Sequence, residues 1–453
     1  MTAPTKTLRT PAEAELIERF GTLRATLPGT AAVKAQRETA FARFERQGLP
    51  HRRVEEWKYS DLRARLRKSA PPAAVLDAKA AKAMLAAAGD PFAGVSRYRL
   101  VLVDGVYAPD LSDRDGLLAD GVEVSSLAEL LKSDRPETAD LLGASEIAVE
   151  DVALALNVAF VTDGVVLFIA KGSQLSMPIE IVHVAGTAAA AGITIRNRVV
   201  IGENVDATII ETSIGGTDGS EINLVSSYVV GSGSHLTVAR LQSVAAGAIH
   251  ISSNVTRLGE NVQLKDLSVE AGASFSRHQT FLTFAGENSR ADVLGVSMLH
   301  GTRHIDQTLV VDHAVPHCTS AELFKTVVDD RASGVFQGKI IVRPDAQKTS
   351  GKMMSQALLL SEEAEMASKP ELEIFADDVV CGHGATVGQI DANHLFYLMA
   401  RGVPRDEAER LLIEAFLADA VDAIGNESVA DELKGTISTW INVRNEGRGA
   451  NAS

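Results

Sequence analysis

Alternating apolar and polar residues fill the middle of this 453-residue chain. Between about residues 167 and 390, short runs rich in β-branched residues, such as residues 208–212, are separated by Gly, Asn and Ser and show hardly any helical periodicity. Strict alternation places successive side chains on opposite faces, as in a half-buried strand. The pattern therefore predicts a long β-rich region.

A turn sequence recurs through this region at a nearly constant interval. Gly-Glu-Asn begins at Gly202, Gly259 and Gly286, and Gly-Ser-His at Gly233 fills the gap, so successive turns lie 31, 26 and 27 residues apart. Repetition at such a period is typical of solenoid coils, which bury their apolar faces against one another. We therefore predict a parallel β-helix. A large antiparallel sandwich is the alternative, and the scarcity of Asn-Gly and Asp-Gly hairpin signals disfavours it.

Both ends of the chain carry helical periodicity instead. In the N-terminal region, apolar residues recur at helical spacing, as at Leu16, Phe20 and Leu23. Near the C-terminus, Pro404 and the acids after it are a helix start signal. The predicted apolar face of that helix consists of Ala408, Leu411, Leu412, Ala415, Phe416 and Ala420.

The fold class predicted from these patterns is mainly β, with α-helical regions on both sides. We divide the chain into an N-terminal helical region (1–95), a mixed α/β lead-in (96–166), a parallel β-helix core (167–392) and a C-terminal helical domain (393–453).

The net charge of -15 and the pI near 5.3 exclude a general binder of nucleic acid or acidic membrane, because phosphate binding needs a basic surface. Two cysteines, Cys318 and Cys381, do not make a disulfide framework. The start of the chain lacks the pattern of a signal peptide, and the most apolar segment, residues 152–170, is too polar for a membrane span. We expect a cytoplasmic protein.

The strongest candidate site is Cys381 with His383. On a strand, residues i and i+2 leave the same face, roughly 7 Å apart at Cα. A thiolate and an imidazole suit iron, zinc or an iron-sulfur cluster, but stable sites usually have about four protein ligands. The pair therefore makes half a metal site. The alternative is that Cys381 is an inert, buried thiol.

A second cluster contains most of the remaining candidates for metal ligands. It comprises His300, His304, His313, His317 and Cys318, all within 19 residues. Of these, His313, His317 and Cys318 are secondary candidate ligands. Alternatively, such histidines form hydrogen bonds with neighbouring backbone.

Other motifs for chemistry are absent from the sequence. Residues 334–340 resemble a phosphate loop but have three residues between the glycines instead of four, and Ile340 replaces the required Ser or Thr. We therefore expect no nucleotide to bind to this chain. The acid pairs Asp329-Asp330 and Asp377-Asp378 point to opposite faces of a strand, so we interpret them as solvated and expect no enzymatic activity.

Several segments resemble the SufB/SufD family of the Suf iron-sulfur cluster assembly scaffold. They are residues 55–59, 313–320, 369–379, Cys381, 383–388, 395–398 and 401–402. The sequence at Cys381-Gly382-His383-Gly384-Ala385 resembles the SufD subunit, because SufB is expected to carry a Glu-His-Glu-Ala-type sequence there. The key cysteine of SufB falls near Ser355, which fits an accessory subunit.

This resemblance implies a right-handed parallel β-helix and a scaffold for ATP-driven cluster assembly. It implies pairing with a SufB-like paralogue through the β-helix, and docking of a SufC-like ABC ATPase on the C-terminal helices. Cys381 and His383 would bind iron or a nascent iron-sulfur cluster, transiently and at the shared interface, with further ligands from the partner. Formation of a homodimer is left open.

Two alternatives belong to other functional classes. A β-helix enzyme acting on polysaccharides would need aromatic platforms and convergent carboxylates, yet aromatic residues make up only 5% of the chain. The other is a stand-alone metal-binding or acyltransferase solenoid. Left-handed acyltransferase coils need a six-residue repeat led by Ile, Leu or Val, and only fragments such as residues 200–205 resemble one.

Overall fold

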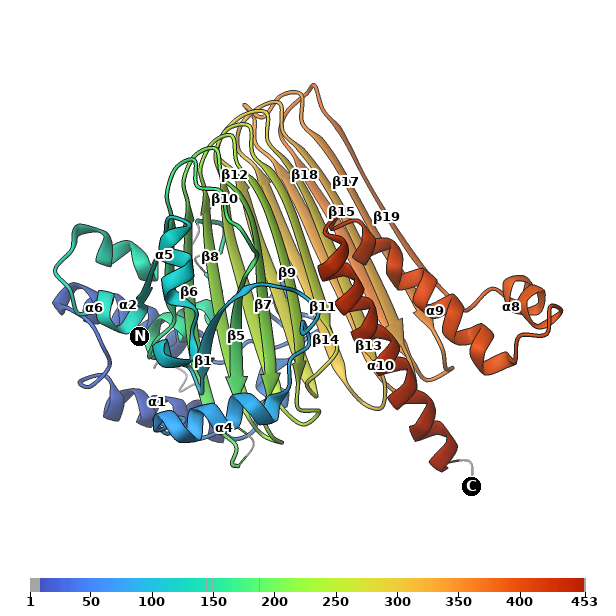
Figure 1. The fold of residues 1–453 in the computed structure, drawn as a ribbon, viewed down its shortest axis with the longest axis horizontal. Coiled ribbons are helices and arrows are strands. Elements are labelled where there is room, and N and C mark those ends of the chain that lie inside the picture. Colours follow the sequence, from blue (N-terminus) through green and yellow to red (C-terminus); the bar gives the residue numbers. More distant parts are fainter. Residues whose placement is uncertain (1–8, 144–145, 149, 187, 452–453) are drawn as a thin grey trace, which may run out of the picture.

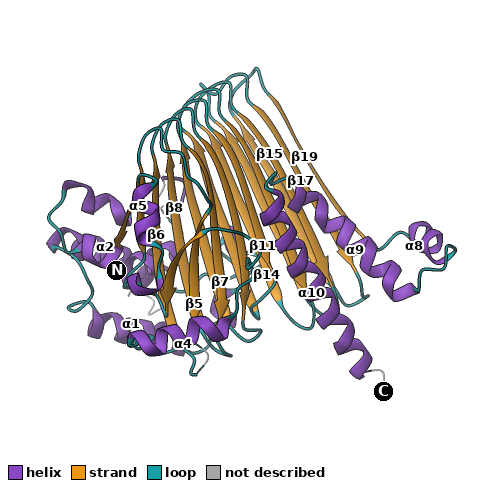
Figure 2. Cartoon of the chain, in the orientation of Figure 1, coloured by secondary structure: helices purple, strands orange, loops and turns teal. Residues whose placement is uncertain are grey.

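The structure is a computed structural model that describes residues 9–143, 146–148, 150–186 and 188–451 (Figure 1). A β-solenoid fills its centre, and helices flank the solenoid at the N- and C-terminal ends of the chain (Figures 1 and 2). The predicted fold class, a mainly β parallel solenoid between helical regions, is confirmed. No helix in the described part of the chain is long and apolar enough to cross a membrane.

The N-terminal helices are α1 (Pro11–Leu23), α2 (Ala31–Gln47), η1 (Glu55–Trp57), α3 (Leu62–Arg65) and α4 (Ala78–Ala88). The lead-in contains β1 (Tyr98–Val103), β2 (Val106–Tyr107), η2 (Pro109–Leu111), α5 (Arg114–Ala119), β3 (Val122–Ser126), α6 (Leu127–Leu131), η3 (Pro136–Leu142), η4 (Glu146–Ala148) and α7 (Val152–Phe160).

The solenoid strands are β4 (Val165–Ile169), β5 (Ile179–Ala185), β6 (Gly192–Ile201), β7 (Asp206–Gly215), β8 (Glu221–Val230), β9 (His235–Val244), β10 (Ile249–Leu258), β11 (Gln263–Glu270), β12 (Phe275–Phe284), β13 (Arg290–Leu299), β14 (His304–His313), β15 (Thr319–Val328), β16 (Ser333–Val342), β17 (Ser350–Leu359), β18 (Glu365–Ile374) and β19 (Val380–Gly388). The C-terminal helices are α8 (Ala392–Met399), α9 (Arg405–Asp422) and α10 (Glu427–Asn451).

Consecutive solenoid strands alternate between two sheets. Sheet A has nine strands in the order β18-β16-β14-β12-β10-β8-β6-β4-β3, and sheet B has ten in the order β19-β17-β15-β13-β11-β9-β7-β5-β1-β2. Among the described residues, the antiparallel strand pairs are β1 with β2 and β3 with β4, and the remaining pairs of named strands are parallel. The antiparallel sandwich is therefore wrong. The division into four domains stays a prediction, since the lead-in strands join the same two sheets.

The recurring turn has a conformational cause. Asn204, Asn261 and Asn288 have φ values of 55°, 56° and 58°, and Gly233 has 72°. This left-handed conformation favours Gly and Asn, so each coil turns at the residue type that tolerates it. The turns also stack, because the Asn204 N–H donates to Ser232 O at 3.0 Å and the Asn261 N–H donates to Glu287 O at 2.9 Å.

The N-terminal helices before α4 cover the outer face of sheet A, whereas α4 packs on β1, β5 and β7 of sheet B. Thr10 and Glu13 start α1 with a reciprocal capping box, and Pro11 occupies its first turn. The buried side chains of these helices pack with Ile251 and Phe275 of sheet A. Burial of each such side chain contributes about 1.5–3 kcal/mol.

Helices α9 and α10 cover the outer face of sheet B in the same way. The residues of α9 that are buried are Ala408, Ile413, Leu417, Ala420 and Val421. The predicted apolar face was partly wrong, because Leu411 and Ala415 are exposed. Apolar residues surround this helix almost completely, so their spacing alone does not single out the face that packs on the sheet.

The two ends of the solenoid differ. At one end the sheets finish in the antiparallel strands β2 and β3. At the other end they finish in β18 and β19, and the residues of β19 are exposed except for Cys381 and Gly384, which are half-buried. We call this second end the open end. Helix α8 lies beyond α9 and away from the sheets (Figure 1).

Candidate functional site

The structure places Cys381 and His383 on the last strand of sheet B, at the open end. In register, Cys381 lies beside Gly351 of β17 and His383 lies beside Met353. Cys381 is half-buried against the core inside the solenoid, and Met353 belongs to that core. Because alternate residues share a face, His383 is on the inner face too, and it is exposed at the open end. The predicted juxtaposition of thiol and imidazole on one face agrees with this strand.

Gly351 leaves space beneath Cys381. A Cβ atom added at Gly351 would lie 3.3 Å from Ile340 Cδ1 and 3.5 Å from both Cys381 Sγ and Ser320 Oγ. Ser320 is the neighbour of Gly351 on β15, and its hydroxyl lies 3.0 Å from His313 Nε2. The thiol therefore faces a small polar group across a position that has no side chain.

The electrostatic surroundings keep the thiol protonated. Burial raises the pKa of Cys381, and the charge of Glu322 raises it further, while a backbone hydrogen bond from Gly351 opposes both. Burial also raises the pKa of Glu322 to about 8. A metal must displace the thiol proton to bind Cys381, as thiolate ligation in general requires.

Glu322 is a site feature that the sequence did not single out. It is 2% exposed, and neither of its carboxylate oxygens has a hydrogen-bond partner among the described residues. An open cavity of about 740 Å³ lies on the outer face of sheet B, where it is lined by residues of β13, β15, β17 and β19 and by Ala423. Glu322, Met353, Cys381 and His383 border it, but their side chains are on the inner face of the sheet. In the sequence, a single acid between Ala321 and Leu323 gave no signal.

The donor set suits a soft or borderline metal. Sulfur from Cys381 and nitrogen from His383 are ligand types of iron, zinc and iron-sulfur clusters. Within the described ranges, no three His, Cys, Asp or Glu side chains stand close enough together to hold a metal ion. The arrangement thus fits part of a metal site, as two ligands on an open strand would provide.

The secondary candidate ligands, His313, His317 and Cys318, lie in different surroundings and do not form a common site. His313 is buried and stacks on Phe284 with ring centroids 4.4 Å apart. His317 is exposed in a turn with φ 60°, the conformation that Asn takes in earlier turns. Cys318 is buried, and its Sγ donates to Gly286 O at 3.4 Å.

Cys318 has a structural counterpart one coil earlier, because Ser289 Oγ donates to Gly259 O at 2.7 Å from the same place in its turn. The other two histidines of that cluster lie elsewhere. His300 packs on Trp440 with ring centroids 5.8 Å apart, and His304 Nε2 lies 2.8 Å from Ser60 Oγ.

Ser355 and Asp329, which the sequence pattern singled out, are both buried. Ser355 is fully buried, and its hydroxyl lies 3.4 Å from the Ser368 hydroxyl. Asp329 was predicted to be solvated, and this was wrong: it is buried and forms an ion pair with Arg444 of α10. Asp330 and the pair Asp377-Asp378 are exposed, as expected.

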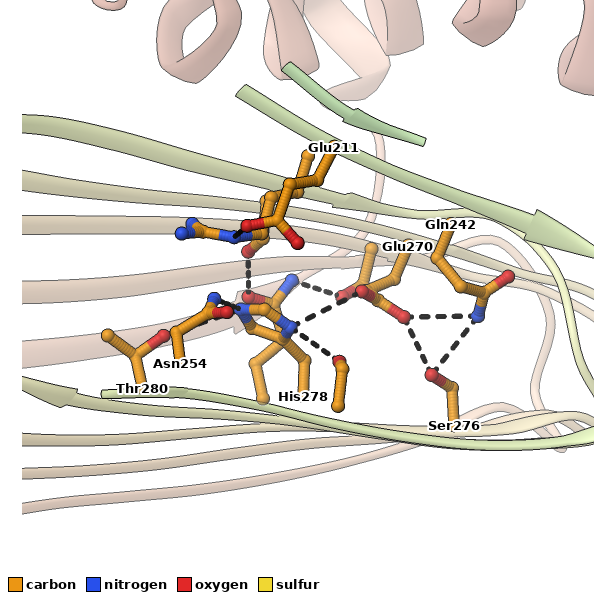
Figure 3. Close-up of polar contacts among 12 residues, drawn as sticks. Glu211, Gln242, Asn254, Glu270, Ser276, His278 and Thr280 are labelled. Atoms are coloured by element: carbon orange, nitrogen blue, oxygen red, sulfur yellow. Dashed lines mark hydrogen bonds and ion pairs between the residues drawn. The ribbon is translucent and has the colours of Figure 1, made fainter. Parts of the chain in front are cut away.

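A second buried polar cluster lies in the middle of the solenoid and was not predicted. Figure 3 shows Glu270 between Gln242, Ser276 and His278. Ser276 Oγ donates to the Glu270 carboxylate at 2.6 Å, and Gln242 Nε2 donates at 3.1 Å. Burial raises the pKa of Glu270 to about 7. Nearby, Arg240 forms ion pairs with Glu211 and Asp266.

Comparison with known proteins gives consistent matches over both halves of the chain. Residues 183–416 match the SufBD core domain of SUF system FeS cluster assembly, and residues 12–181 match the SufBD protein N-terminal region. An iron-sulfur cluster assembly SufBD family protein of Synechocystis is 31% identical over 405 residues, which cover 86% of this chain and 87% of the relative. The iron-sulfur cluster assembly protein SufD of Escherichia coli is 30% identical over 392 residues, or 86% and 88% of the two chains. SufD of Bacillus subtilis is 29% identical over 294 residues, or 62% and 65%.

Proposed function

This chain belongs to the SufBD family of iron-sulfur cluster assembly proteins, and we propose that it is the SufD-like scaffold subunit of such a system. In this proposal it has no catalytic activity of its own. It pairs with a SufB-like paralogue, docks a SufC-like ABC ATPase, and supplies ligands for iron or a nascent cluster at the shared interface. The cluster is cargo that leaves the scaffold.

The observation that carries the proposal is the position of Cys381 and His383. They stand on the inner face of the last strand, where the next coil would be if the solenoid continued. A partner that extends the sheets would place its own side chains directly beyond them. Two ligands from each chain would complete a four-ligand site.

The open end itself is suited to pairing. A strand at the edge of a sheet presents unpaired backbone N–H and C=O groups that can pair with another strand. Exposed apolar side chains surround these edges, including Phe375 at 60%, Val380 at 68% and Val387 at 47% exposure. A paralogue with the same coil geometry fits such an edge, and so does a second copy of this chain.

Helix α8 supports the proposed ATPase contact. Phe396, Tyr397 and Met399 are 72%, 55% and 41% exposed, and the helix has no buried residue. Arg401 lies against the Tyr397 ring, 3.6 Å from its centroid. An apolar helix face rimmed by polar residues is typical of a protein docking surface. Helices α9 and α10 connect this surface to sheet B, on which they pack.

Measurement of bound iron tests the proposed site. We expect anaerobically purified complexes with the paralogue and ATPase to contain iron and acid-labile sulfide. Replacing both ligands, Cys381→Ala with His383→Ala, should lower that content at least about tenfold and abolish complementation in a strain that depends on this system.

The matched control replaces the other thiol and a neighbouring imidazole, Cys318→Ser with His317→Asn, which should retain iron and complementation. Complementation by the Cys381 and His383 double variant at the wild-type level would contradict the site assignment.

A further inference from the structure

Glu322 has no role in the site proposed above. Its side chain is 2% exposed, on the same inner face as Cys381 and His383. Both carboxylate oxygens lack a hydrogen-bond partner in the described part of the chain. Burying a carboxyl group without partners destabilises a fold, so packing within this chain does not explain the residue. It instead indicates a ligand that the carboxylate meets.

The register of the strands brings Glu322 beneath the two proposed ligands. Glu322 of β15 is in line with Met353 of β17 and His383 of β19. Met353 separates the two, but its thioether is directed across the interior towards Gly338, where an added Cβ would lie 2.4 Å from Sδ. Glycine at this facing position therefore accommodates the methionine.

The neighbouring column holds a residue without a side chain. Gly351 lies between Ser320 and Cys381. A Cβ atom added at Gly351 would lie 3.3 Å from Ile340 Cδ1 and 3.5 Å from both Cys381 Sγ and Ser320 Oγ, so the Ile340 side chain packs over this position. Ile340 and Met353 must therefore shift for Glu322 to reach the sulfur.

We propose that Glu322 is the third ligand that this chain supplies, so that Cys381, His383 and Glu322 together hold one ferrous ion before the partner's ligands arrive. This inference rests on the proposed function of Cys381 and His383 and deepens it. Sulfur, nitrogen and oxygen donors suit a borderline metal such as Fe²⁺. Three protein ligands leave a position free for a further ligand.

Binding requires side chains to move, because the three groups do not surround a common point among the described residues. His383 is exposed and sits between two glycines, and a Cβ added at Gly382 would meet nothing within 4 Å. Neither carboxylate oxygen of Glu322 has a hydrogen-bond partner in the described part of the chain, although the Ser320 hydroxyl is near enough to lower the pKa of its carboxyl group. Both side chains must reorient towards the Cys381 sulfur for binding, and Met353 and Ile340 must shift to admit Glu322.

The test is anaerobic titration of the purified full chain, without partners, with Co²⁺ as a spectroscopic substitute for Fe²⁺. The thiolate-to-cobalt charge-transfer band reports Cys381. We expect the wild type to bind one Co²⁺ with this band, and Glu322→Gln to weaken binding at least about tenfold while the band at saturation is kept. Asp292→Asn is the matched control, because Asp292 lies on the neighbouring strand one residue out of register with Glu322, faces the outer side of the sheet and is paired with Arg290 at 2.6 Å, so it should bind as the wild type does.

A second variant changes the space between Glu322 and Cys381 and none of the ligands. Gly351→Ala adds a methyl group 3.3 Å from Ile340 Cδ1 and 3.5 Å from both Cys381 Sγ and Ser320 Oγ, so it should weaken Co²⁺ binding by hindering the approach of Glu322. Circular dichroism and thermal unfolding establish that each variant is folded. If Glu322→Gln does not fold, Gly351→Ala decides the question.

The inference is overturned if Glu322→Gln, or in its place Gly351→Ala, binds Co²⁺ as tightly as the wild type. It is also overturned if the wild-type chain alone gives no charge-transfer band. In that case Cys381 and His383 stay candidate ligands, and the iron content of the complex tests them separately. Wild-type binding by Cys381→Ala would instead contradict the proposed site itself.

Discussion

Glu270 illustrates how single ionisable residues inside the solenoid couple its stability to pH. Its carboxyl group accepts hydrogen bonds from Ser276 and Gln242, lies 3.7 Å from His278 Nδ1 and feels the charge of Arg240. Burial outweighs these favourable contacts and raises the pKa of Glu270 from 4.5 to about 7. The folded protein therefore holds a proton that the unfolded chain releases at lower pH.

The sign of the resulting pH dependence is fixed by linkage. The stabilising contribution of protonated Glu270 is fully present below pH 4.5 and is lost as the pH rises through about 7. We expect Glu270→Gln to remove this loss, so that the free energy of unfolding of the variant gains about 3 kcal/mol on the wild type between pH 4.5 and 7. Urea unfolding at several pH values measures the free energy of unfolding of both proteins. A difference between variant and wild type that does not change with pH would contradict the expectation.

Arg277 is a second residue with a measurable role. Its guanidinium pairs with Asp306, donates to Glu56 O at 2.7 Å and lies 4.0 Å from the centroid of the Trp57 ring. Arg277 and Asp306 are both fully buried. These contacts fasten the segment around η1 to the outer face of sheet A.

Replacing Arg277 with Met leaves a buried carboxylate without its cation, so we expect a loss of about 3–5 kcal/mol in the free energy of unfolding. Limited proteolysis near residues 50–60 should also become faster. Arg290→Met is the control: its side chain is 53% exposed in the pair with Asp292, so its loss should stay below about 1 kcal/mol. Equal losses of unfolding free energy in the two variants would show that the buried ion pair stabilises the fold no more than the exposed one.

At the scale of elements, the edge strand β19 determines whether the solenoid can extend into a partner. Natural edge strands avoid pairing through charges, especially Lys. In β19, Val380 and Val387 are exposed instead of charged. This composition favours pairing.

We expect Val380→Lys with Val387→Lys to abolish pairing with the paralogue while changing the unfolding free energy by no more than about 0.5 kcal/mol, because both side chains are exposed. Size-exclusion chromatography of the co-expressed subunits measures pairing. Val75→Lys, at an 82% exposed position in the N-terminal region, should leave pairing intact. Persistence of the pair in the double variant would rule out this edge as the interface.

Considered as a whole, the molecule presents two separate surfaces, the open end of the solenoid and helix α8. Figure 1 shows α8 beyond α9, away from the sheets. Under the proposed function, these two surfaces would bind the ATPase and the paralogue. Because the surfaces are separate, a substitution in one should abolish binding of one partner and leave binding of the other intact.

We expect Phe396→Asp to abolish ATPase binding and keep pairing with the paralogue, and the lysine variants of β19 to do the reverse. Affinity capture of each partner from co-expressed subunits is the measurement. Leu118→Asp, at a 67% exposed position on α5, should keep both partners. Loss of both partners from one variant would mean that the surfaces are not independent.

Much of this arrangement follows from local sequence. Alternation predicts strands, and Asn or Gly at fixed intervals predicts the left-handed turns that stack coil on coil. The spacing of Cys381 and His383 places them on one face of any strand. These features depend on neighbouring residues only, so the sequence shows them directly. Asp329 is different, because its partner Arg444 lies 115 residues away in the chain.

What the sequence determined by itself is therefore the period, the turns and the alternation of faces; what only the tertiary structure decided is which face points inward. In β11, Leu267 and Val269 pack outward beneath the C-terminal helices, while Asp266 and Glu270 point into the solenoid. Alternation specifies that neighbours point in opposite directions, but not which direction is inside. That choice depends on helices that come some 140 residues later. Because these helices cover Leu267 and Val269, the acids Asp266 and Glu270 are buried inside the solenoid.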